Sequence, residues 1–287
     1  MKPSIFTGFF ERYTPEDAIL QLRAAGFSYG EFVVDHSLQL LNRGKNVEKT
    51  GLQFRAFLED QSFALPQGHL NFLEDLCLPE TVEYLKREIT LFQAIGVRNA
   101  VFHINGGLEL PAEQRFEIQQ RHIRELLDFV KGTDFTFCLE NLMTTPTLTD
   151  ADKLLNWIEI LGGKNLGICL DTGHLHYSRL GLRTTEQTHV EFIQKAGKYL
   201  KATHIQSNDG SGDQHLAPYT GRKNPIDWPG IVAALREIGY DELFSLEVCG
   251  ETETYPPLPI LKAKLTYMKN LLDLMLSTPA STTPADL

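Results

Sequence analysis

The feature that most constrains the fold is a repeated junction, in which a helical stretch ends at a glycine and a short apolar run follows. Gly26, Gly96 and Gly239 stand at three such junctions. Glycine after a helix adopts the left-handed backbone conformation at little cost, so each junction predicts a helix end that leads into a strand. Apolar residues at spacings of three and four over 82–92 and 116–130 predict helices between the strands. The chain is therefore expected to alternate strands with helices.

Eight apolar runs are predicted to be strands. They lie near residues 4–9, 30–34, 65–70, 99–103, 135–140, 166–171, 201–205 and 243–247. Strands separated by helices need crossover connections and pair in parallel. In a chain of 287 residues this predicts an α/β protein, a single (β/α)₈ TIM barrel over residues 1–276. An open doubly wound sheet is the alternative, but no GxGxxG or GxxxxGK[ST] motif follows any of these runs.

Composition limits the partners and the surroundings. The chain carries 27 basic and 37 acidic side chains, a net charge of -10 that disfavours nucleic acid as a partner. No apolar run approaches the roughly 18 residues of a membrane span, and the first residues lack a signal-peptide pattern, so we expect no membrane partner and a cytoplasmic protein. The small, polar residues 277–287 predict a flexible tail. We predict no disulfide, because the cysteines lie far apart in no CxxC pair: Cys77, Cys138, Cys169 and Cys249.

Metal-type ligands mark six consecutive strand ends, from the third strand to the eighth. They are His69, His103, Glu140, Asp171, His204 and Glu247. Loops add three more, His174, Asp213 and His215. The carboxyl ends of the strands carry the site in a TIM barrel, and a buried charge is costly unless it is paired or metal-bound. The coincidence favours a site over isolated helix caps. We expect the remaining histidines to be ordinary surface or hydrogen-bonded residues outside the site. They are His36, His122, His176 and His189.

The residues two positions before several of these ligands are small. Cys138, Cys169, Ala202 and Ser245 share a strand face with the ligands that follow them, so they are expected to fill the barrel interior one layer below. With the thiols placed there, the ligand set is rich in oxygen and imidazole. Such donors suit manganese, magnesium, cobalt or zinc.

Five motifs in chain order carry a resemblance to a known family. They are Leu139-Glu-Asn141, Cys169-Leu-Asp-Thr-Gly-His174, His204-Ile-Gln-Ser-Asn-Asp209, Asp213-Gln-His215 with Ile226-Asp-Trp228, and Leu246-Glu-Val248. In this order they resemble the xylose-isomerase-like TIM-barrel superfamily over nearly the whole chain before the tail. That superfamily contains sugar-phosphate isomerases and epimerases, inosose-processing enzymes and apurinic-site endonucleases of the endonuclease IV type.

The resemblance implies two ligand sets. In the sugar branch it implies that Glu140, Asp171, His204 and Glu247 hold one divalent cation. The endonuclease branch has a trinuclear zinc site, and its additional ligands match by position His69, His103, His174, Asp213 and His215. These residues are therefore candidates for a second metal or for the substrate, and His174 and Arg222 are candidates for substrate oxygens or a phosphate. The segment over 216–223 departs from the glycine-rich version common in the family.

The predicted function is a divalent-metal-dependent isomerase or epimerase that moves a proton beside a carbonyl through an enediolate. Its substrate and partner would be a sugar, a sugar phosphate or a cyclitol. Glu140 and Glu247 are the predicted catalytic residues, one removing the proton and the other returning it, with the metal as Lewis acid. An endonuclease IV-like multi-zinc phosphodiesterase is one alternative, which the net charge disfavours, and a non-catalytic metal- or ligand-binding barrel is another. The sequence leaves a homo-oligomer open.

Overall fold

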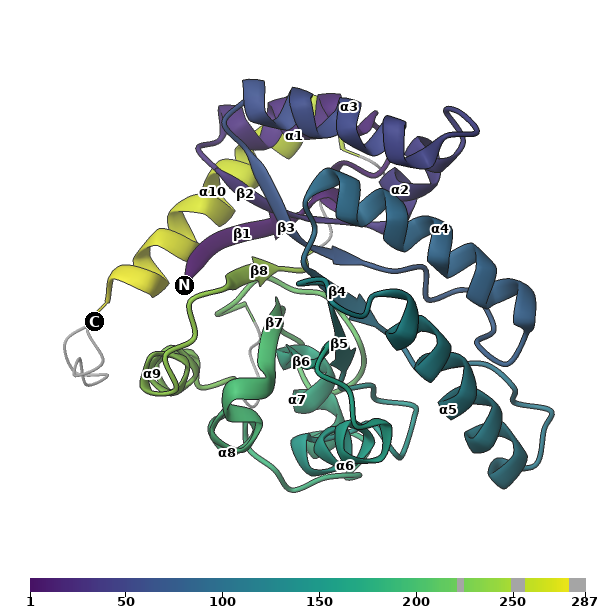
Figure 1. Cartoon of the computed structure of the whole chain (residues 1–287). Coiled ribbons are helices and arrows are strands. Elements are labelled where there is room, and N and C mark those ends of the chain that lie inside the picture. The colour runs from purple at the N-terminus through teal and green to yellow at the C-terminus, as the bar shows by residue number, and fades with distance from the viewer. Residues whose placement is uncertain (221–224, 249–255, 279–287) are drawn as a thin grey trace.

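Eight parallel strands close into a barrel in chain order (Figure 1). The computed structural model describes residues 1–220, 225–248 and 256–278. The strands are β1 (Lys2–Phe6), β2 (Tyr29–Phe32), β3 (Ala64–His69), β4 (Asn99–Phe102), β5 (Thr136–Glu140), β6 (Leu166–Asp171), β7 (Leu200–Ile205) and β8 (Leu243–Leu246). The barrel closes where β8 pairs with β1, with Ser245 beside Ser4. The predicted (β/α)₈ TIM barrel is confirmed.

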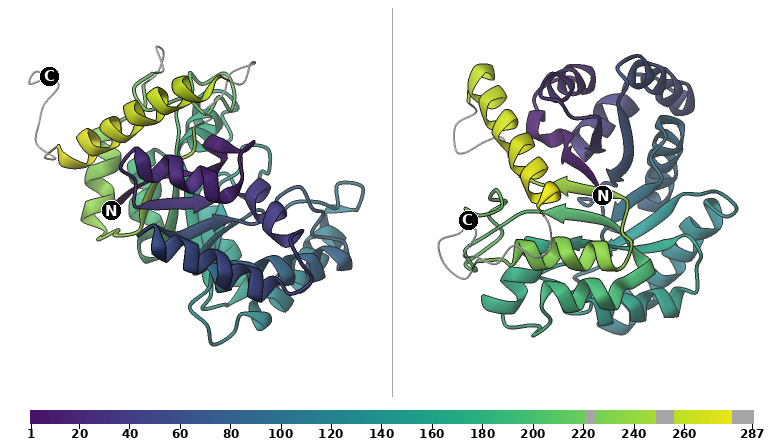
Figure 2. Two further views of the ribbon diagram at one scale, coloured as in Figure 1. Left: turned by 90° about the horizontal axis from the view of Figure 1, so that it is seen from above. Right: turned by 90° about the vertical axis from the view of Figure 1, so that its left-hand side faces the viewer.

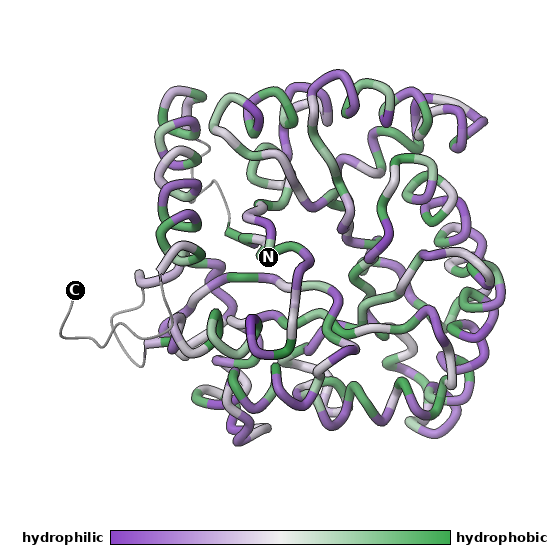
Figure 3. The backbone as a smooth tube through the Cα atoms, turned by 60° about the vertical axis from the view of Figure 1, so that its left-hand side comes forward, coloured by the Kyte–Doolittle hydropathy of each residue, from purple (hydrophilic) through white to green (hydrophobic). Residues whose placement is uncertain are grey.

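Helices form an outer ring around the strands, which both views of Figure 2 show. They are η1 (Thr7–Phe10), α1 (Pro15–Ala24), α2 (Val34–Leu41), α3 (Val47–Asp60), α4 (Pro79–Ile95), α5 (Ala112–Phe129), α6 (Ala151–Leu161), α7 (Thr172–Leu180), α8 (His189–Ala196), η2 (Gly197–Tyr199), α9 (Trp228–Glu237) and α10 (Leu258–Ser277). Along the helices of Figure 3, hydrophilic and hydrophobic segments alternate. In α4 the predicted apolar face is buried through Leu85, Ile89 and Phe92, as expected for a helix that packs on a barrel.

The glycine junctions have the predicted conformation. The φ angles of Gly26, Gly96 and Gly239 are 91°, 105° and 70°, all in the left-handed region. Each follows or closes the end of a helix, α1, α4 or α9, and a strand begins within a few residues. Three of the helix-to-strand connections are therefore set by local backbone chemistry.

The first strand differs from its prediction over 4–9. β1 ends at Phe6, and η1 then turns Phe9 and Phe10 into the core, where both side chains are fully buried. A short apolar run satisfies a buried turn as well as a strand, so its composition alone does not fix the boundary. At the other end of the chain, α10 includes residue 277 of the predicted tail, and the tail residues 279–287 lie outside the described residues.

A layer of small side chains fills the barrel interior. Val101, Cys138, Cys169 and Ala202 are fully buried and form a cluster of their own, separate from the larger core between strands and helices. The predicted layer below the ligands is thus present for Cys138, Cys169 and Ala202. Cys77, Cys138 and Cys169 are free thiols, while Cys249 lies outside the described residues. Among the described helices, none combines the length and the apolar character needed to cross a membrane.

Candidate metal centre

The predicted ligands lie together at the carboxyl end of the barrel, in three groups. Within each group one ligand atom per residue lies within 4.8 Å of the others. The four-ligand group is Glu140, Asp171, His204 and Glu247; the first triad is His69, His103 and Glu140; the second triad is His174, Asp213 and His215. Glu140 belongs to two groups and so joins the four-ligand group to the first triad. Arg222, the remaining predicted site residue, lies outside the described residues.

Strand ends position most of these side chains. His69, Glu140 and Asp171 are the last residues of β3, β5 and β6, and His103 and Glu247 directly follow β4 and β8. Side chains two apart on a strand point the same way, so ligands that follow the buried layer by two residues face the barrel axis above it. Asp171 is also the N-cap of α7, where its carboxylate accepts a hydrogen bond from the His174 backbone N–H.

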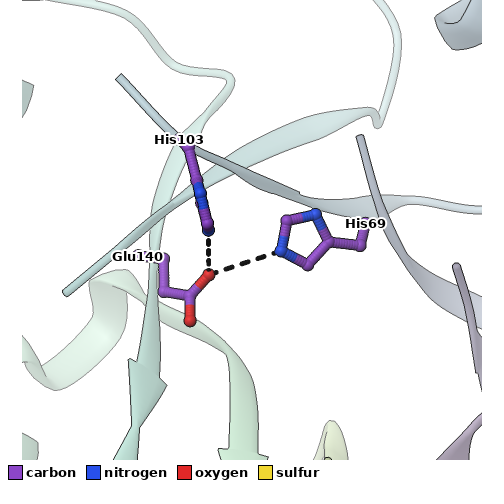
Figure 4. Close-up of side chains that lie close together, drawn as sticks. All are labelled: His69, His103 and Glu140. Atoms are coloured by element: carbon purple, nitrogen blue, oxygen red, sulfur yellow. Dashed lines mark hydrogen bonds and ion pairs between the residues drawn. The ribbon is translucent and has the colours of Figure 1, made fainter. Parts of the chain in front are cut away.

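In the first triad, both histidines face the same carboxylate oxygen (Figure 4). His103 Nε2 lies 2.6 Å and His69 Nε2 lies 3.5 Å from Glu140 Oε2. Burial lowers the pKa of His103, so the neutral ring donates its N–H to Glu140. Burial opposes charge on His69 as well, but Glu140 raises the pKa of that ring.

The second triad repeats this arrangement around Asp213. His174 Nε2 and His215 Nε2 lie 3.4 Å and 3.0 Å from Asp213 Oδ2. Although burial opposes it, the Asp213 carboxylate raises the pKa of His215 to about 9. His215 has a φ of 47°, a left-handed conformation that is uncommon outside glycine and that often marks functional sites.

The four-ligand group centres on His204. Its Nδ1 lies 3.1 Å from Glu140 Oε1, 3.2 Å from Glu247 Oε2 and 3.9 Å from Asp171 Oδ2. Burial raises the pKa of Asp171 to about 7. Burial acts the same way on Glu247, but His204 outweighs it and lowers the Glu247 pKa to about 2. Despite burial, His204 and His103 hold the Glu140 pKa well below its usual value.

The charge balance of the three groups fits a bound cation. Within the described residues, every ion pair of Glu140, Asp171, Asp213 and Glu247 is made with a histidine. The buried Glu247 Oε2 accepts no hydrogen bond from the described residues. Clustered carboxylates whose partners are histidines depend on protonated imidazoles or on a bound cation for their charge balance, and oxygen and imidazole donors suit a divalent ion. Burial raises the pKa values of Cys138 and Cys169, so both stay protonated below the ligands.

Hydrogen bonds fix the orientation of the candidate ligand rings. His69 Nδ1 donates to Leu70 O at 2.8 Å, His174 Nδ1 to Asn141 O at 2.9 Å, and His215 Nδ1 to Glu247 O at 3.0 Å. In each ring Nε2 then faces a carboxylate of its triad. Histidines that bind metals characteristically use the second nitrogen in this way.

The other four histidines lie outside the three groups. His36 bonds Thr7 Oγ1, His122 bonds Leu76 O and His189 bonds Thr172 O, while the buried His176 ring stacks on His189. Burial lowers the pKa values of His36 and His189 to about 4. His36, His122 and His189 are hydrogen-bonded parts of the fold, as expected from the sequence.

Sequence reasoning missed two buried polar residues beside the ligands, Glu31 and Gln206. Gln206 Nε2 donates to Asp213 Oδ1 at 2.8 Å and to Asp171 Oδ1 at 3.3 Å, so it links two groups. It needs the space beside Gly173, where a Cβ atom would lie 2.1 Å from Gln206 Oε1. Glu31 on β2 lies under His204, 2.8 Å from its Nε2. The signal for Glu31 was an acidic residue inside an apolar strand.

A closed parallel (β/α)₈ barrel with histidines and carboxylates at its carboxyl end defines a TIM-barrel protein with a candidate metal centre. A family model described as a xylose isomerase-like TIM barrel matches residues 19–271. The chain belongs to the xylose isomerase-like TIM-barrel family.

Solved structures with a similar fold include several sugar epimerases. The D-psicose 3-epimerase of Clostridium cellulolyticum H10 has a TM-score of 0.75 at 16% identity, covering 97% of this chain and 100% of that one. An L-ribulose 3-epimerase has a TM-score of 0.72 at 19% identity, covering 96% and 94%. The 3-keto-D-glucoside 4-epimerase of E. coli has a TM-score of 0.70 at 15% identity, covering 94% and 99%. At these identities the likeness shows the shared fold.

Curated relatives are uncharacterized proteins. The protein y4fM of Sinorhizobium fredii is 27% identical over 168 residues, which is 55% of this chain and 50% of the relative. The protein MJ1311 of Methanocaldococcus jannaschii is 32% identical over 96 residues, 33% of this chain and 30% of the relative. The chain therefore matches half or less of the length of these relatives.

Proposed function

We propose that the protein is a divalent-metal-dependent isomerase or epimerase of a sugar, sugar phosphate or cyclitol, which moves a proton at a carbon beside a carbonyl. The observation that carries the proposal is the four-ligand group, in which Glu140, Glu247, Asp171 and His204 converge at the carboxyl end of the barrel. The sugar epimerases among the solved structures of similar fold support the substrate class.

The four-ligand group would hold the cation. When bound there, a manganese, magnesium, cobalt or zinc ion supplies Lewis-acid polarisation of a carbonyl and a neighbouring hydroxyl. The oxygen-rich donor set and the clustered negative charge support this assignment.

The two glutamates would move the proton. Both have lowered pKa values and are ionised at neutral pH, so each is ready to accept a proton in the free enzyme. One takes the proton from carbon as the electron pair spreads onto the carbonyl oxygen. The other first takes up a proton from solvent and then gives it to carbon, while the first releases its proton to solvent. Return to the opposite face of the same carbon epimerises the sugar, and return to the neighbouring carbon isomerises it. Positioned acid-base groups contribute about 10² to 10⁴ in rate.

We propose that a hollow near the ends of β4 and β5 takes the remainder of a substrate, although none of the nine candidate ligands lines it. A cavity of about 430 Å³ lies between the loops that follow β4 and β5, the strands that lead to His103 and Glu140. Asn105, Arg115, Thr145 and Trp157 contribute to its lining. Hydroxyl, amide and guanidinium groups beside an aromatic ring are suited to a polar, hydroxylated ligand.

The deciding experiment follows hydrogen at carbon. The purified protein, loaded in turn with each of the four ions, is incubated in D₂O with aldoses, ketoses and inososes, and NMR reads deuterium beside the carbonyl. We expect incorporation with at least one substrate class, and its loss on chelation. A protein that binds metal but incorporates deuterium in none of them would refute the proposal and favour a non-catalytic barrel.

A multi-metal phosphodiesterase is the second candidate, favoured by one specific observation. The first and second triads add five further ligand residues around the four-ligand group, with Glu140 shared. Two or more adjacent ions stabilise the attacking and leaving oxygens in phosphodiester hydrolysis. The net charge of -10 argues against a nucleic acid substrate.

Metal counting and a cleavage assay separate the two candidates. One ion per chain by elemental analysis, with no cleavage of duplex DNA that carries an abasic site, supports the isomerase. Two or three ions, with robust cleavage that is lost on Asp213→Ala, would establish the phosphodiesterase instead.

A further inference from the structure

A further buried carboxylate, Glu31 of β2, lies next to the four-ligand group through His204. Its side chain is 2% exposed, and His204 Nε2 lies 2.8 Å from Glu31 Oε1. The other carboxylate oxygen accepts hydrogen bonds from Gln67 Nε2 at 2.8 Å and from Ser245 Oγ at 2.9 Å. Both donors are themselves buried, Gln67 on β3 and Ser245 on β8. Glu31 is therefore fixed from three sides, and one oxygen points at His204.

His204 differs from three of the other candidate ligand histidines in the group that anchors it. His69, His174 and His215 each donate one ring N–H to a neutral backbone carbonyl, although His174 Nδ1 also lies 3.3 Å from Glu140 Oε1. His204 meets a carboxylate instead, and this is the ion pair recorded for Glu31 within the described residues. An acceptor that carries a full negative charge binds an N–H about twice as strongly as a neutral one.

The hydrogen bond to Glu31 also decides which nitrogen of the His204 ring faces the four-ligand group. With Nε2 engaged by Glu31, the opposite nitrogen of His204 faces all three carboxylates of the four-ligand group. In His69, His174 and His215 it is Nε2 that faces the carboxylate of the triad, because the backbone carbonyl engages Nδ1. His204 is thus reversed relative to them.

We infer that Glu31 is a positioning residue for the metal site: it fixes His204 with Nε2 protonated and Nδ1 directed at the ion, and its charge makes that nitrogen a stronger donor. A carboxylate behind a ligating histidine fixes the ring tautomer and orientation and raises the basicity of the ligand. The inference rests on the metal requirement of the proposed function and adds to it a residue on a strand that carries none of the nine ligands.

The first test measures metal affinity without any sugar. Metal-free wild type and Glu31→Gln are titrated with Zn²⁺, Mn²⁺ or Co²⁺ against a chromophoric chelator. Glutamine keeps the size and one oxygen acceptor but removes the charge. We expect the tightest-binding site to weaken about 10- to 100-fold, the usual effect of losing such a partner.

Glu88→Gln is the matched control. Glu88 is also fully buried and accepts two hydrogen bonds, from Ser37 Oγ at 2.6 Å and from the Asn71 N–H at 2.9 Å. Its carboxylate contacts none of the nine ligand side chains through a hydrogen bond or ion pair within the described residues. We expect wild-type metal affinity in this variant, and an equal loss in both variants would assign the effect to general disturbance of the core and overturn the inference.

The second test needs no variant of Glu31. In the Zn²⁺-loaded wild type, long-range ¹H–¹⁵N spectra report which nitrogen of each imidazole carries the proton, and His204→Asn identifies the His204 signals. We expect His204 to be protonated at Nε2 and His69, His174 and His215 to be protonated at Nδ1. A His204 ring protonated at Nδ1 would overturn the inference even if Glu31→Gln does not fold.

The outcomes separate this inference from the proposed function. Wild-type affinity in Glu31→Gln would refute the positioning role and leave the isomerase intact. Weakened metal binding together with no deuterium incorporation in any sugar would refute the isomerase and leave the positioning role intact. A wild type that binds none of the three ions would refute both.

Discussion

The two ends of the barrel handle charge in opposite ways. At the amino end, Lys2 and Arg98 each lie 4.0 Å from Glu242, and their side chains are 34% and 49% exposed. At the carboxyl end, Glu140 and His204 are 2% and 0% exposed, and histidines are the recorded partners of the carboxylates among the described residues. Both ends are rich in charged groups. Only at the amino end are the carboxylates balanced by water and by permanently charged side chains.

This difference indicates which end of the barrel should change its charge with pH. An exposed ion pair contributes about 0 to 1 kcal/mol and keeps its charge across the physiological pH range. A buried carboxylate whose partners are histidines depends on groups that gain or lose a proton near neutral pH. Either protons or a divalent ion can therefore balance the negative charge at the carboxyl end. A metal that binds there would compete with protons for the same side chains.

The largest expected effect is at Glu140, which two ligand groups share. Glu140→Gln removes a charge from both groups and one proposed proton carrier, so we expect turnover to fall about 10² to 10⁴-fold with the fold retained. Glu247→Gln should lower turnover similarly but lose fewer ions, because Glu247 belongs to one group. Steady-state rates, elemental analysis and circular dichroism check the pair, and near-wild-type turnover in either variant would contradict the assigned mechanism.

The next effect concerns pH, because metal binding must displace protons. The pKa of His215 is raised to about 9 and those of His174 and His204 are raised well above 6.5, so these rings are protonated in the metal-free protein at neutral pH. Below a raised pKa, each proton displaced weakens metal binding about tenfold per pH unit. We expect affinity to rise with pH between 6 and 9 and protons to be released on binding. Chelator competition at several pH values measures this, and a flat profile would show that the carboxyl end lacks this competition.

A smaller effect on the proposed reaction is expected from the residues that the two triads add to the four-ligand group. Asp213→Ala with His215→Ala, and separately His103→Ala, should lower sugar turnover less than Glu140→Gln does, because the four-ligand group keeps all its residues. Kinetics and metal counts on the same preparations test the expectation. A metal count that falls together with complete loss of turnover would instead make the added ions essential.

The smallest effect is expected at the amino end. Glu242→Gln breaks two long, partly exposed pairs, each 4.0 Å, so we expect the free energy of unfolding to change by no more than about 1 kcal/mol. Metal affinity should not change. Denaturant titration and chelator competition measure the two quantities, and a large loss of metal affinity would erase the contrast between the ends.

Much of the carboxyl end was predictable from sequence because it follows local rules. The twofold alternation of a strand places Glu140 above Cys138 and Asp171 above Cys169, and glycine chemistry sets junctions such as Gly96. These patterns lie within a few residues of one another, so they survive without knowledge of the closed barrel. The fold and the convergence of the nine candidate ligands could therefore be predicted.

The contacts that could not be predicted from the sequence form only when the barrel closes. Glu31 and His204 are separated by 173 positions and meet only because β2 and β7 face the same interior. Gln206 reaches Asp171 because Gly173, 33 residues before it, lacks a side chain. The end of β1 at Phe6 was set by burial of Phe9 and Phe10 in a turn, which an apolar run does not distinguish from a strand.

The layer of Val101, Cys138, Cys169 and Ala202 limits the routes by which a molecule can reach the candidate ligands. These side chains are fully buried in the barrel interior, one layer below the candidate ligands, and they fill the barrel there. The proposed cation and substrate would therefore reach the candidate ligands over the loops at the carboxyl rim, and the product would leave by the same route. In the proposed reaction, the order in which cation and substrate bind and product is released would then affect turnover.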